Sequence, residues 1–165
     1  MPYTDKFQPT DDLLTHLNSV VPTIKDSFIL SRYTGFVSIS AVTVYELAIK
    51  EIFIDFAKRK HKIFGNFTEI SLGRINGRIK ISDLKKEFIT KFGDKYVKKF
   101  EKALTNNQSL LNNQNLDIQV SYNNLLNCRH SFVHKNIVTM TYSEVIIAYN
   151  FGKEVIKSLA EAMSR

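Results

Sequence analysis

Apolar residues recur at intervals of three and four along most of the chain, and this spacing restricts the fold more than any other feature. Between residues 40 and 61 it places Tyr45, Ile49 and Ile52 on one stripe of a helix. Further apolar side chains widen this stripe, as is typical of a central helix with more than one neighbour. No long stretch alternates apolar and polar residues as a half-buried strand does. The sequence therefore predicts an all-α bundle with short connections.

Local signals predict where several helices begin and end. Pro22 interrupts the first apolar stretch, which follows an expected N-cap at Thr10. The tripeptide Tyr33-Thr34-Gly35 is typical of a turn, and Gly65 is expected to stop the helix that ends in a basic run. The tetrapeptide Thr141-Tyr142-Ser143-Glu144 fits a capping box, which predicts that the last helix starts there.

Length and composition indicate a small folded protein. The 165 residues are enough for a buried core, and we expect residues 1–165 to form a single domain. The one cysteine, Cys128, cannot form an internal disulfide, and no signal peptide is visible. The longest apolar run, around residues 36–45, is too short to span a bilayer. We therefore expect a soluble, cytoplasmic protein that does not bind a membrane.

The excess of basic residues points to an anionic partner. The chain has 23 Lys and Arg against 16 Asp and Glu, a net charge of +7. A surplus of this size indicates RNA, DNA, a nucleotide or a membrane surface without choosing among them. One basic group is a candidate for binding an RNA backbone electrostatically, and it is equally consistent with a solvated helix end. Its members are Lys58, Arg59, Lys60, Lys62, Arg74 and Arg78, with Lys80 beside them.

Residues 121–135 form the predicted helix that carries chemistry. Because each residue advances about 100° around a helix, four polar side chains share one stripe about 60° wide. They are Asn123, Asn127, His130 and His134. Arg129 borders the stripe, whereas Cys128 and Phe132 lie on the opposite, apolar side. Arg grips phosphate oxygens, carboxamides add neutral donors, and His exchanges protons near neutral pH, so this surface suits a phosphate.

Other interpretations of the same helix stay open. An Arg and two His on an amphipathic helix are often no more than a solvated face. His130 and His134 have zinc-ligand spacing, but Ser131 stands where the HExxH pattern needs Glu, and no third ligand is evident nearby. Cys128 is a weaker candidate for a nucleophile because it lies on the apolar side.

The hexapeptide Arg129-His130-Ser131-Phe132-Val133-His134 matches R-x4-H, the motif of the HEPN superfamily. The apolar lead-in and the long final helix are also similar, and residues 40–65 resemble the second helix of the RiboL-PSP-HEPN type, with Glu46 on an otherwise apolar helix. The resemblance covers about residues 41–163, with a poorly matched middle. It implies an up-and-down helical bundle of the HEPN type with additional short helices. One departure is Lys135, which stands at the position after the His where a small residue or Gly is often found. This departure affects the expected geometry of the helix end.

The resemblance implies a metal-independent endoribonuclease that needs no cofactor and cleaves RNA as a homodimer. Arg129 and His134 would be catalytic, with His130 and Asn127 in support. Glu46 would be either a buried partner of Arg129 or an exposed helix residue. Many members of the family are toxins or antiviral-defence effectors, so a cognate antitoxin or another defence-system protein is an expected partner.

Two other functions are compatible with the sequence. HEPN-like domains also serve as non-catalytic modules that bind a nucleotide or RNA, or that assemble with a nucleotidyltransferase or another defence protein. In that case Arg129 and His134 would bind a nucleotide phosphate. A purely structural helical dimer is the third interpretation, and it predicts neither cleavage nor salt-dependent RNA binding.

Overall fold

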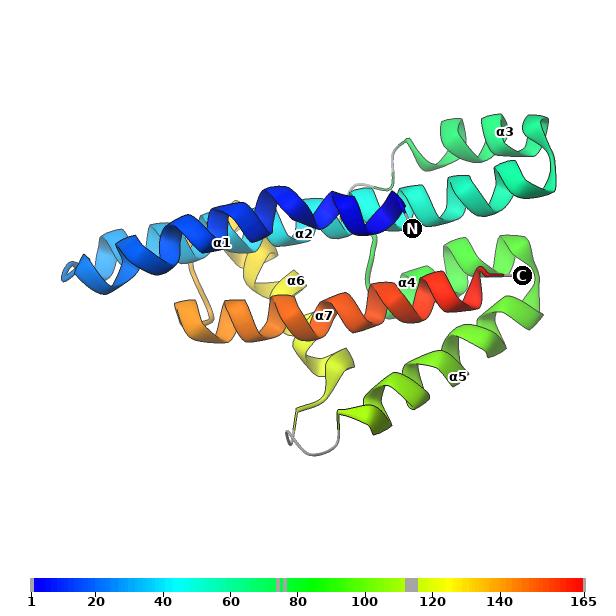
Figure 1. Cartoon of the computed structure of the whole chain (residues 1–165). Coiled ribbons are helices and arrows are strands. Elements are labelled where there is room, and N and C mark those ends of the chain that lie inside the picture. Colours follow the sequence, from blue (N-terminus) through cyan, green and yellow to red (C-terminus); the bar gives the residue numbers. More distant parts are fainter. Residues whose placement is uncertain (1, 74, 76, 112–115, 165) are drawn as a thin grey trace.

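The computed structural model describes residues 2–73, 75, 77–111 and 116–164, and these residues contain helices and no strand (Figure 1). The predicted all-α class is therefore confirmed. In chain order the elements are η1 (Pro2–Phe7), α1 (Gln8–Val20), η2 (Val21–Thr23), α2 (Ser27–Lys60), α3 (Lys62–Leu72), α4 (Ile81–Asp83), η3 (Leu84–Phe88), η4 (Ile89–Phe92), α5 (Asp94–Leu110), α6 (Ile118–Lys135) and α7 (Tyr142–Ala162).

Helix α2 is the central element of the bundle. It has 34 residues, which makes it about 50 Å long. It packs against α1, α3, α6 and α7, and α5 packs on the outer side of α7 (Figure 1). Its broad apolar surface, predicted from the stripe that includes Tyr45 and Ile49, is buried because several neighbours share it. Asp26 caps its start by accepting hydrogen bonds from the amides of Phe28 and Ile29.

The expected turn at Gly35 is wrong, because this glycine lies inside α2. A Cβ atom there would lie only 2.4 Å from Cε2 of Phe132 on α6. Glycine is therefore needed for the close approach of α2 and α6 and not for a turn.

Gly65 is likewise not the end of a helix. Helix α2 ends at Lys60, and His61 has an extended backbone with φ of −165°. Gly65 lies within α3, where a Cβ atom would lie 2.3 Å from Cγ of Lys58. The helix is interrupted at His61, and α3 folds back against the end of α2. Gly65 therefore also allows two helices to pack closely.

Three helices begin earlier than predicted, and one of them is α2, which starts at Ser27 and not at Ser38 or Ser40. Helix α1 starts at Gln8, and Thr10 is a buried residue whose hydroxyl bonds to that of Ser40 at 2.7 Å. Helix α6 starts at Ile118 because the Asp117 carboxylate accepts from the amides of residues 119 and 120, at 2.7 and 2.9 Å.

The last helix starts as predicted. Thr141 and Glu144 form the capping box, since each side chain accepts a hydrogen bond from the backbone amide of the other residue. The hydrogen bond from the Thr141 amide lowers the pKa of Glu144. This start fixes the position of α7 directly after the connection from the motif helix.

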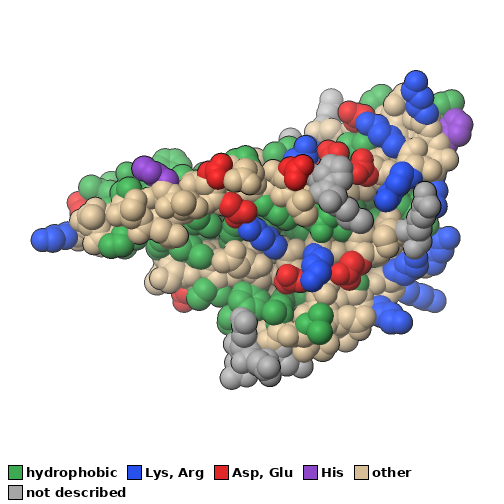
Figure 2. Space-filling model, viewed as in Figure 1, with side chains coloured by type: hydrophobic (Ala, Val, Ile, Leu, Met, Phe, Trp, Pro, Cys, Tyr) green, Lys and Arg blue, Asp and Glu red, His purple; other side chains and the backbone are tan. Residues whose placement is uncertain are grey.

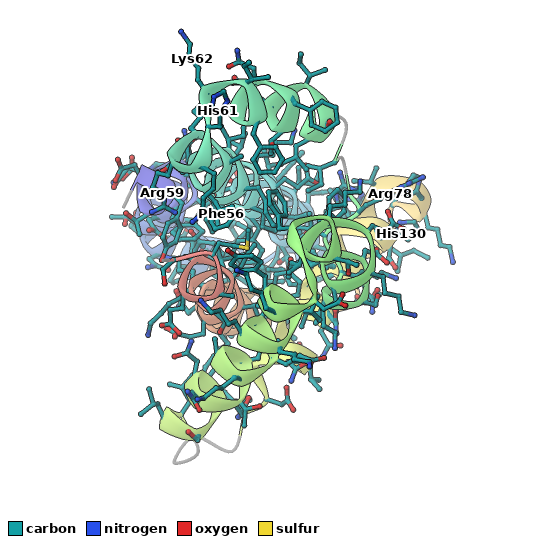
Figure 3. The ribbon with its side chains drawn as sticks, turned by 90° about the vertical axis from the view of Figure 1, so that its right-hand side faces the viewer. Phe56, Arg59, His61, Lys62, Arg78 and His130 are labelled. Carbon is teal, nitrogen blue, oxygen red and sulfur yellow. The ribbon has the colours of Figure 1, made fainter. Side chains whose placement is uncertain are left out.

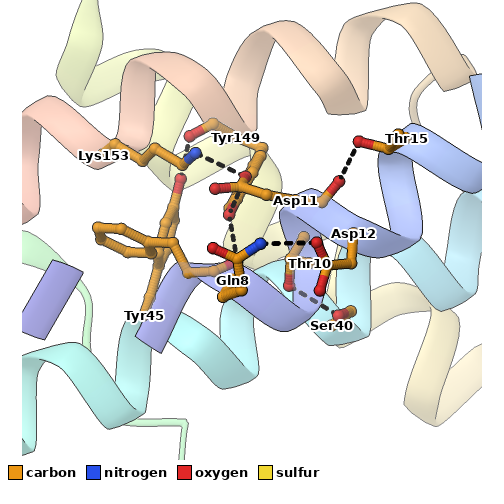
Figure 4. A network of polar contacts seen from close by, with 10 residues as sticks. Gln8, Thr10, Asp11, Asp12, Thr15, Ser40, Tyr45, Tyr149 and Lys153 are labelled. Carbon is orange, nitrogen blue, oxygen red and sulfur yellow. Dashed lines mark hydrogen bonds and ion pairs between the residues drawn. The ribbon is translucent and has the colours of Figure 1, made fainter. Parts of the chain in front are cut away.

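Three stacked tyrosines join α2, α6 and α7 in the core. The ring of Tyr45 lies between those of Tyr122 and Tyr149, with centroid distances of 5.5 and 5.7 Å. The Tyr149 hydroxyl donates to Asp11 at 2.9 Å, and Asp11 also pairs with Lys153 at 2.7 Å, which ties α1 to α7 (Figure 4). Burial raises the pKa of all three tyrosines, and the Asp11 carboxylate raises that of Tyr149 further.

Candidate functional site

Arg129 lies in a small cavity between α2, α6 and the segment before α4. The cavity has a volume of about 100 Å³, and its polar lining comes from Lys80, Asn127, Arg129 and His130. The Nη1 atom of Arg129 lies 3.8 Å from the position that a Cβ atom on Gly77 would occupy. Its Nε is buried and has no hydrogen-bond partner among the described residues. A buried, unpaired guanidinium N–H favours an anionic ligand at this place.

Glu46 positions the segment that covers Arg129. Its Oε1 accepts a hydrogen bond from the Gly77 amide at 2.8 Å, and Gly77 has a φ of +76°, which favours glycine. The Tyr122 hydroxyl holds the same segment by donating to the Ile79 carbonyl at 2.7 Å. Within the described chain, Glu46 and Arg129 form no ion pair. Of the two alternatives for Glu46, the direct ion pair with Arg129 is therefore not formed among the described residues, and both side chains lie close to Gly77 instead.

The two histidines of the motif lie on the exposed side of α6. The ring centroids of His130 and His134 are 4.5 Å apart, and His130 also lines the Arg129 cavity. His134 is not among the residues that line it. On a regular helix it is displaced from Arg129 by about 140° around the axis and about 7.5 Å along it. Within one chain, His130 therefore lies between the guanidinium and the His134 imidazole.

The motif helix ends in a left-handed residue. Asn136 has a φ of +58°, and its amide donates to the Phe132 carbonyl at 2.9 Å. Arg32 on α2 donates to the Asn136 side chain, and its guanidinium lies over the rings of Phe28 and Phe132. The missing glycine after His134 is thus compensated one residue later, because Asn tolerates this conformation better than most residues. In the sequence, Asn136 itself is the residue that could have indicated this helix end.

A larger hollow adjoins the Arg129 cavity. It has a volume of about 470 Å³ and lies between residues 80–85 and the first half of α6. Lys80 and Asn127 line both the hollow and the cavity, so the two spaces are neighbours. Sequence reasoning identified Asn127 and Lys80 but missed Lys85 and Gln119, because their proximity depends on how the 80–85 segment crosses α6.

Most of the predicted RNA-binding cluster lies elsewhere. From the helical rise per residue, Lys58 lies about 18 Å from Glu46 along the axis of α2. Figure 3 separates Arg59 and Lys62 from Arg78 and His130, which lie on another side of the bundle. The structure therefore does not bring the end of α2 to the motif, whereas Arg78 and Lys80 lie nearer to it. Arg74 falls outside the described residues.

Several basic side chains of this cluster have structural contacts. Lys58 pairs with Glu69 at 3.2 Å, and Arg59 donates to the Met163 carbonyl at the end of α7 at 3.2 Å. Lys60 lies over the ring of Phe56. Arg78 has its guanidinium 3.8 Å from Glu87. These contacts support the interpretation of a solvated helix end for the first three.

The positive charge is concentrated in the middle of the chain. Residues 58–102 carry 14 Lys and Arg against 5 Asp and Glu, a net charge of +9, so the rest of the chain carries −2. Figure 2 shows Lys and Arg side chains gathered at the right-hand end, where α3 and α5 begin. One part of this segment, residues 80–85, forms a wall of the hollow beside the motif.

A helical bundle whose second-to-last described helix carries R-x4-H is characteristic of HEPN proteins. The chain matches the family model RiboL-PSP-HEPN over residues 5–165 and therefore belongs to this family. Neither a curated protein nor a solved structure shows significant similarity to it. In the described part of the chain, no helix is both long enough and apolar enough to cross a bilayer. No cluster of three or more His, Cys, Asp or Glu residues suited to a metal occurs there either.

Proposed function

We propose that this protein is a metal-independent endoribonuclease that acts as a toxin or an antiviral-defence effector, with a cognate antitoxin or another defence protein as its partner. The observation that carries the proposal is the environment of Arg129. Arg129 is half-buried, its Nε has no hydrogen-bond partner among the described residues, and none of those residues that line its cavity is acidic. Lys80, Asn127 and His130 complete a lining that favours a phosphate.

The reaction uses the RNA itself as nucleophile. The 2′-oxygen attacks the adjacent phosphorus, and the bond from phosphorus to the 5′-oxygen breaks. His134 removes the proton from the 2′-hydroxyl or donates one to the leaving 5′-oxygen, and Arg129 stabilises the charge that develops on the phosphoryl oxygens. The products are a 2′,3′-cyclic phosphate and a 5′-hydroxyl. DNA lacks the 2′-hydroxyl and does not react.

A second copy of the chain completes this site in the proposal. His134 is displaced from the Arg129 cavity, so a linkage bound at one guanidinium is more easily reached by a histidine across a two-fold axis. One His134 then acts as the base and its counterpart as the acid.

Exposed apolar side chains near the end of the motif helix support the dimer. Phe28 and Phe36 of α2 are 64% and 58% exposed, and Val133 and Ile137 are 48% and 55% exposed. We call these four residues the motif-end patch. In Figure 1 the start of α2 extends past the start of α7 and lies beside α1, so α7 does not cover this part of α2. A stable dimer needs about 1,200 Å² of buried surface or more. The motif-end patch would be part of that interface.

The test is cleavage of total RNA in a chelator. Wild-type protein is expected to cleave RNA, and Arg129→Ala or His134→Ala to lower the rate by about 10²- to 10⁴-fold with an unchanged helical circular dichroism spectrum. Lys135→Ala is the matched control, because Lys135 is exposed on the same helix end and lies outside the motif. DNA of the same sequence should remain intact. Equal cleavage by wild type and His134→Ala would reject the nuclease.

A non-catalytic module is the second candidate. It is favoured by the separation of His134 from the Arg129 cavity within one chain. As a module, the protein would bind a nucleotide or RNA at Arg129 or assemble with a nucleotidyltransferase. Calorimetric titration with ATP separates the two: tight, Arg129-dependent binding with no RNA cleavage supports the module, whereas cleavage in chelator supports the nuclease.

A further inference from the structure

We propose that the hollow between residues 80–85 and the first half of α6 is a subsite that holds one unpaired base of single-stranded RNA next to the linkage bound at Arg129. The carboxamides of Gln119, Asn123 and Asn127 contact the base, and Lys80 contacts its phosphate. This inference rests on the proposed function, and it adds a determinant of nucleotide preference to it.

The first argument is continuity. The hollow has a volume of about 470 Å³, within the range of roughly 300–1,000 Å³ that is usual for small-ligand sites. It shares Lys80 and Asn127 with the Arg129 cavity. A strand bound at Arg129 therefore has its neighbouring nucleotide in contact with the hollow.

The second argument is the row of carboxamides on α6. Gln119, Asn123 and Asn127 are spaced by four residues, so they lie on one face of the helix, and all three line the hollow. None of the three side chains makes a hydrogen bond to another described residue. By contrast, the amides of Asn107 and Gln108 are engaged, with Ser158 at 2.9 Å and with the Leu116 carbonyl at 2.9 Å. The row on α6 thus keeps its donors and acceptors available for a ligand.

The third argument is the distribution of charge. Lys80 is exposed and has no ion pair in the described parts of the chain, whereas Lys85 is paired with Glu101 at 2.9 Å. Arg129 and Lys80 are thus cations available to phosphates, and both line the Arg129 cavity together with Asn127. Cations at the backbone and carboxamides at the base edge form the usual division of roles in nucleic-acid recognition.

The carboxamides favour a single strand over a duplex. In an RNA duplex the deep, narrow major groove keeps side chains away from N6 and N7 of adenine, so these atoms are available only when the base is unpaired, and sequence-specific RNA recognition uses such bases. Asn and Gln pair with adenine through two hydrogen bonds, each such pair being worth about 1–3 kcal/mol of discrimination. A preference at one nucleotide follows, with adenine as the first base to examine.

The experiment measures binding and not cleavage. Short 2′-O-methyl oligonucleotides, which lack the attacking hydroxyl, are titrated by fluorescence anisotropy against the full chain, using homopolymers of each base. Asn123→Ala and Gln119→Ala are expected to weaken binding of the preferred homopolymer by about 5- to 100-fold and to reduce the difference among bases. Lys80→Gln is expected to weaken all homopolymers alike and to lower the slope of log K against log salt by about 0.7, the value for one phosphate contact to a single strand.

Asn124→Ala is the matched control, because Asn124 is an exposed amide on α6 that does not line this hollow. Its binding should equal that of wild type, and thermal melting checks that every variant folds. If Asn123→Ala and Asn124→Ala bind all homopolymers as wild type does, the subsite is wrong. If AMP binds as tightly as the oligonucleotide, the hollow is a site for a free nucleotide and the strand subsite is likewise overturned.

The two proposals fail separately. If wild-type protein does not cleave RNA but the oligonucleotide binds in an Asn123-dependent way, the nuclease is rejected and the subsite is supported. If RNA is cleaved in an Arg129- and His134-dependent way, and Asn123→Ala retains both affinity and base preference, the nuclease is supported and the subsite is rejected.

Discussion

At the scale of single residues, the glycines of this chain serve two different physical purposes. Gly35, Gly65 and Gly152 lie inside helices, where a Cβ atom would lie 2.3 to 2.4 Å from a side chain of a neighbouring helix. Gly77 and Gly93 have positive φ and lie where the chain turns or a helix ends. Glycine in a sequence does not distinguish these purposes, because the first depends on a residue that is distant along the chain. The wrong predictions at Gly35 and Gly65 have this cause.

Gly35→Ala tests the close approach of α2 to α6. The new methyl group meets the ring of Phe132, so the helices must separate. Overpacking typically costs about 1–3 kcal/mol, whereas replacing Gly by Ala in a helix gains roughly 1 kcal/mol of helix propensity. The cost exceeds the gain only where the overpacked contact is rigid. We expect the free energy of unfolding, measured by urea denaturation, to fall by about 1–2 kcal/mol. The same substitution made in a Phe132→Leu background should have a smaller effect; an equal effect would mean that this contact is not the cause.

At the scale of elements, the ends of α6 decide where the motif stands. Asp117 sets its start, and Asn136 sets its end, where Arg32 of α2 holds it. The loop over Arg129 is fixed from two helices, by Glu46 of α2 and by Tyr122 of α6 itself. The caps are short-range signals of the sequence, although the expected start of this helix near Ser121 missed Asp117. The loop has no such signal, since Glu46 and Gly77 are 31 residues apart.

Substitution of Asn136 separates backbone conformation from side-chain contact. Asn136→Gly loses the contact with Arg32 but accepts the positive φ, whereas Asn136→Ala loses the contact and also meets the left-handed penalty. We expect the alanine variant to be less stable than the glycine variant by about 1 kcal/mol in thermal or chemical denaturation. Equal stabilities would show that the helix end adopts another conformation in solution.

At the scale of the whole molecule, charge and apolar surface are segregated. Residues 58–102 carry the net positive charge, and the motif-end patch lies near the start of α2 and the end of α6. The Arg129 cavity and its adjoining hollow lie between these regions, with Lys80 from the basic segment at the boundary. This arrangement favours a partner chain on one side of the motif and a polyanion on the other.

The motif-end patch is tested by its effect on oligomeric state. Phe36→Glu and Ile137→Glu place a charge in the proposed interface, so we expect the dimer dissociation constant to rise by about 10-fold or more. RNA cleavage should fall with the dimer fraction, as measured by light scattering coupled to gel filtration. Ile70→Glu is the control, since Ile70 is 81% exposed on α3, far along the chain from the motif. A wild-type protein that is monomeric at micromolar concentration would contradict the composite site.

Stability at high pH is a second property of the whole core. Burial raises the pKa of Tyr45, Tyr122 and Tyr149, so these groups stay neutral in the folded state. In the unfolded chain tyrosines ionise near pH 10, and the unfolded state then binds fewer protons than the folded state. The free energy of unfolding should therefore be unaffected by these groups below about pH 10 and fall above it.

Each tyrosine contributes a slope of up to about 1.4 kcal/mol per pH unit, which is roughly 4 kcal/mol per unit for the three together. Denaturation series at increasing pH measure this slope, and Tyr149→Phe should reduce it by about one third. Tyrosinate absorbance reports the ionisation free of Trp absorbance, and the signal of these three tyrosines is separated from that of the other four of the seven by comparison with Tyr149→Phe. A flat stability profile to well above pH 10 would contradict the burial of these rings.

By itself the sequence determined the helical class, the capped start of α7 at Thr141 and the polar stripe of the motif helix. These depend on periodicity and on contacts within about four residues, which a single sequence displays. Tertiary structure alone decided that Gly35 spaces two helices, that Glu46 bonds to Gly77 and forms no ion pair with Arg129 among the described residues, and that Lys80 faces the carboxamides of α6. Such contacts join residues tens of positions apart, and they are selected by the packing of the whole core and not by local spacing.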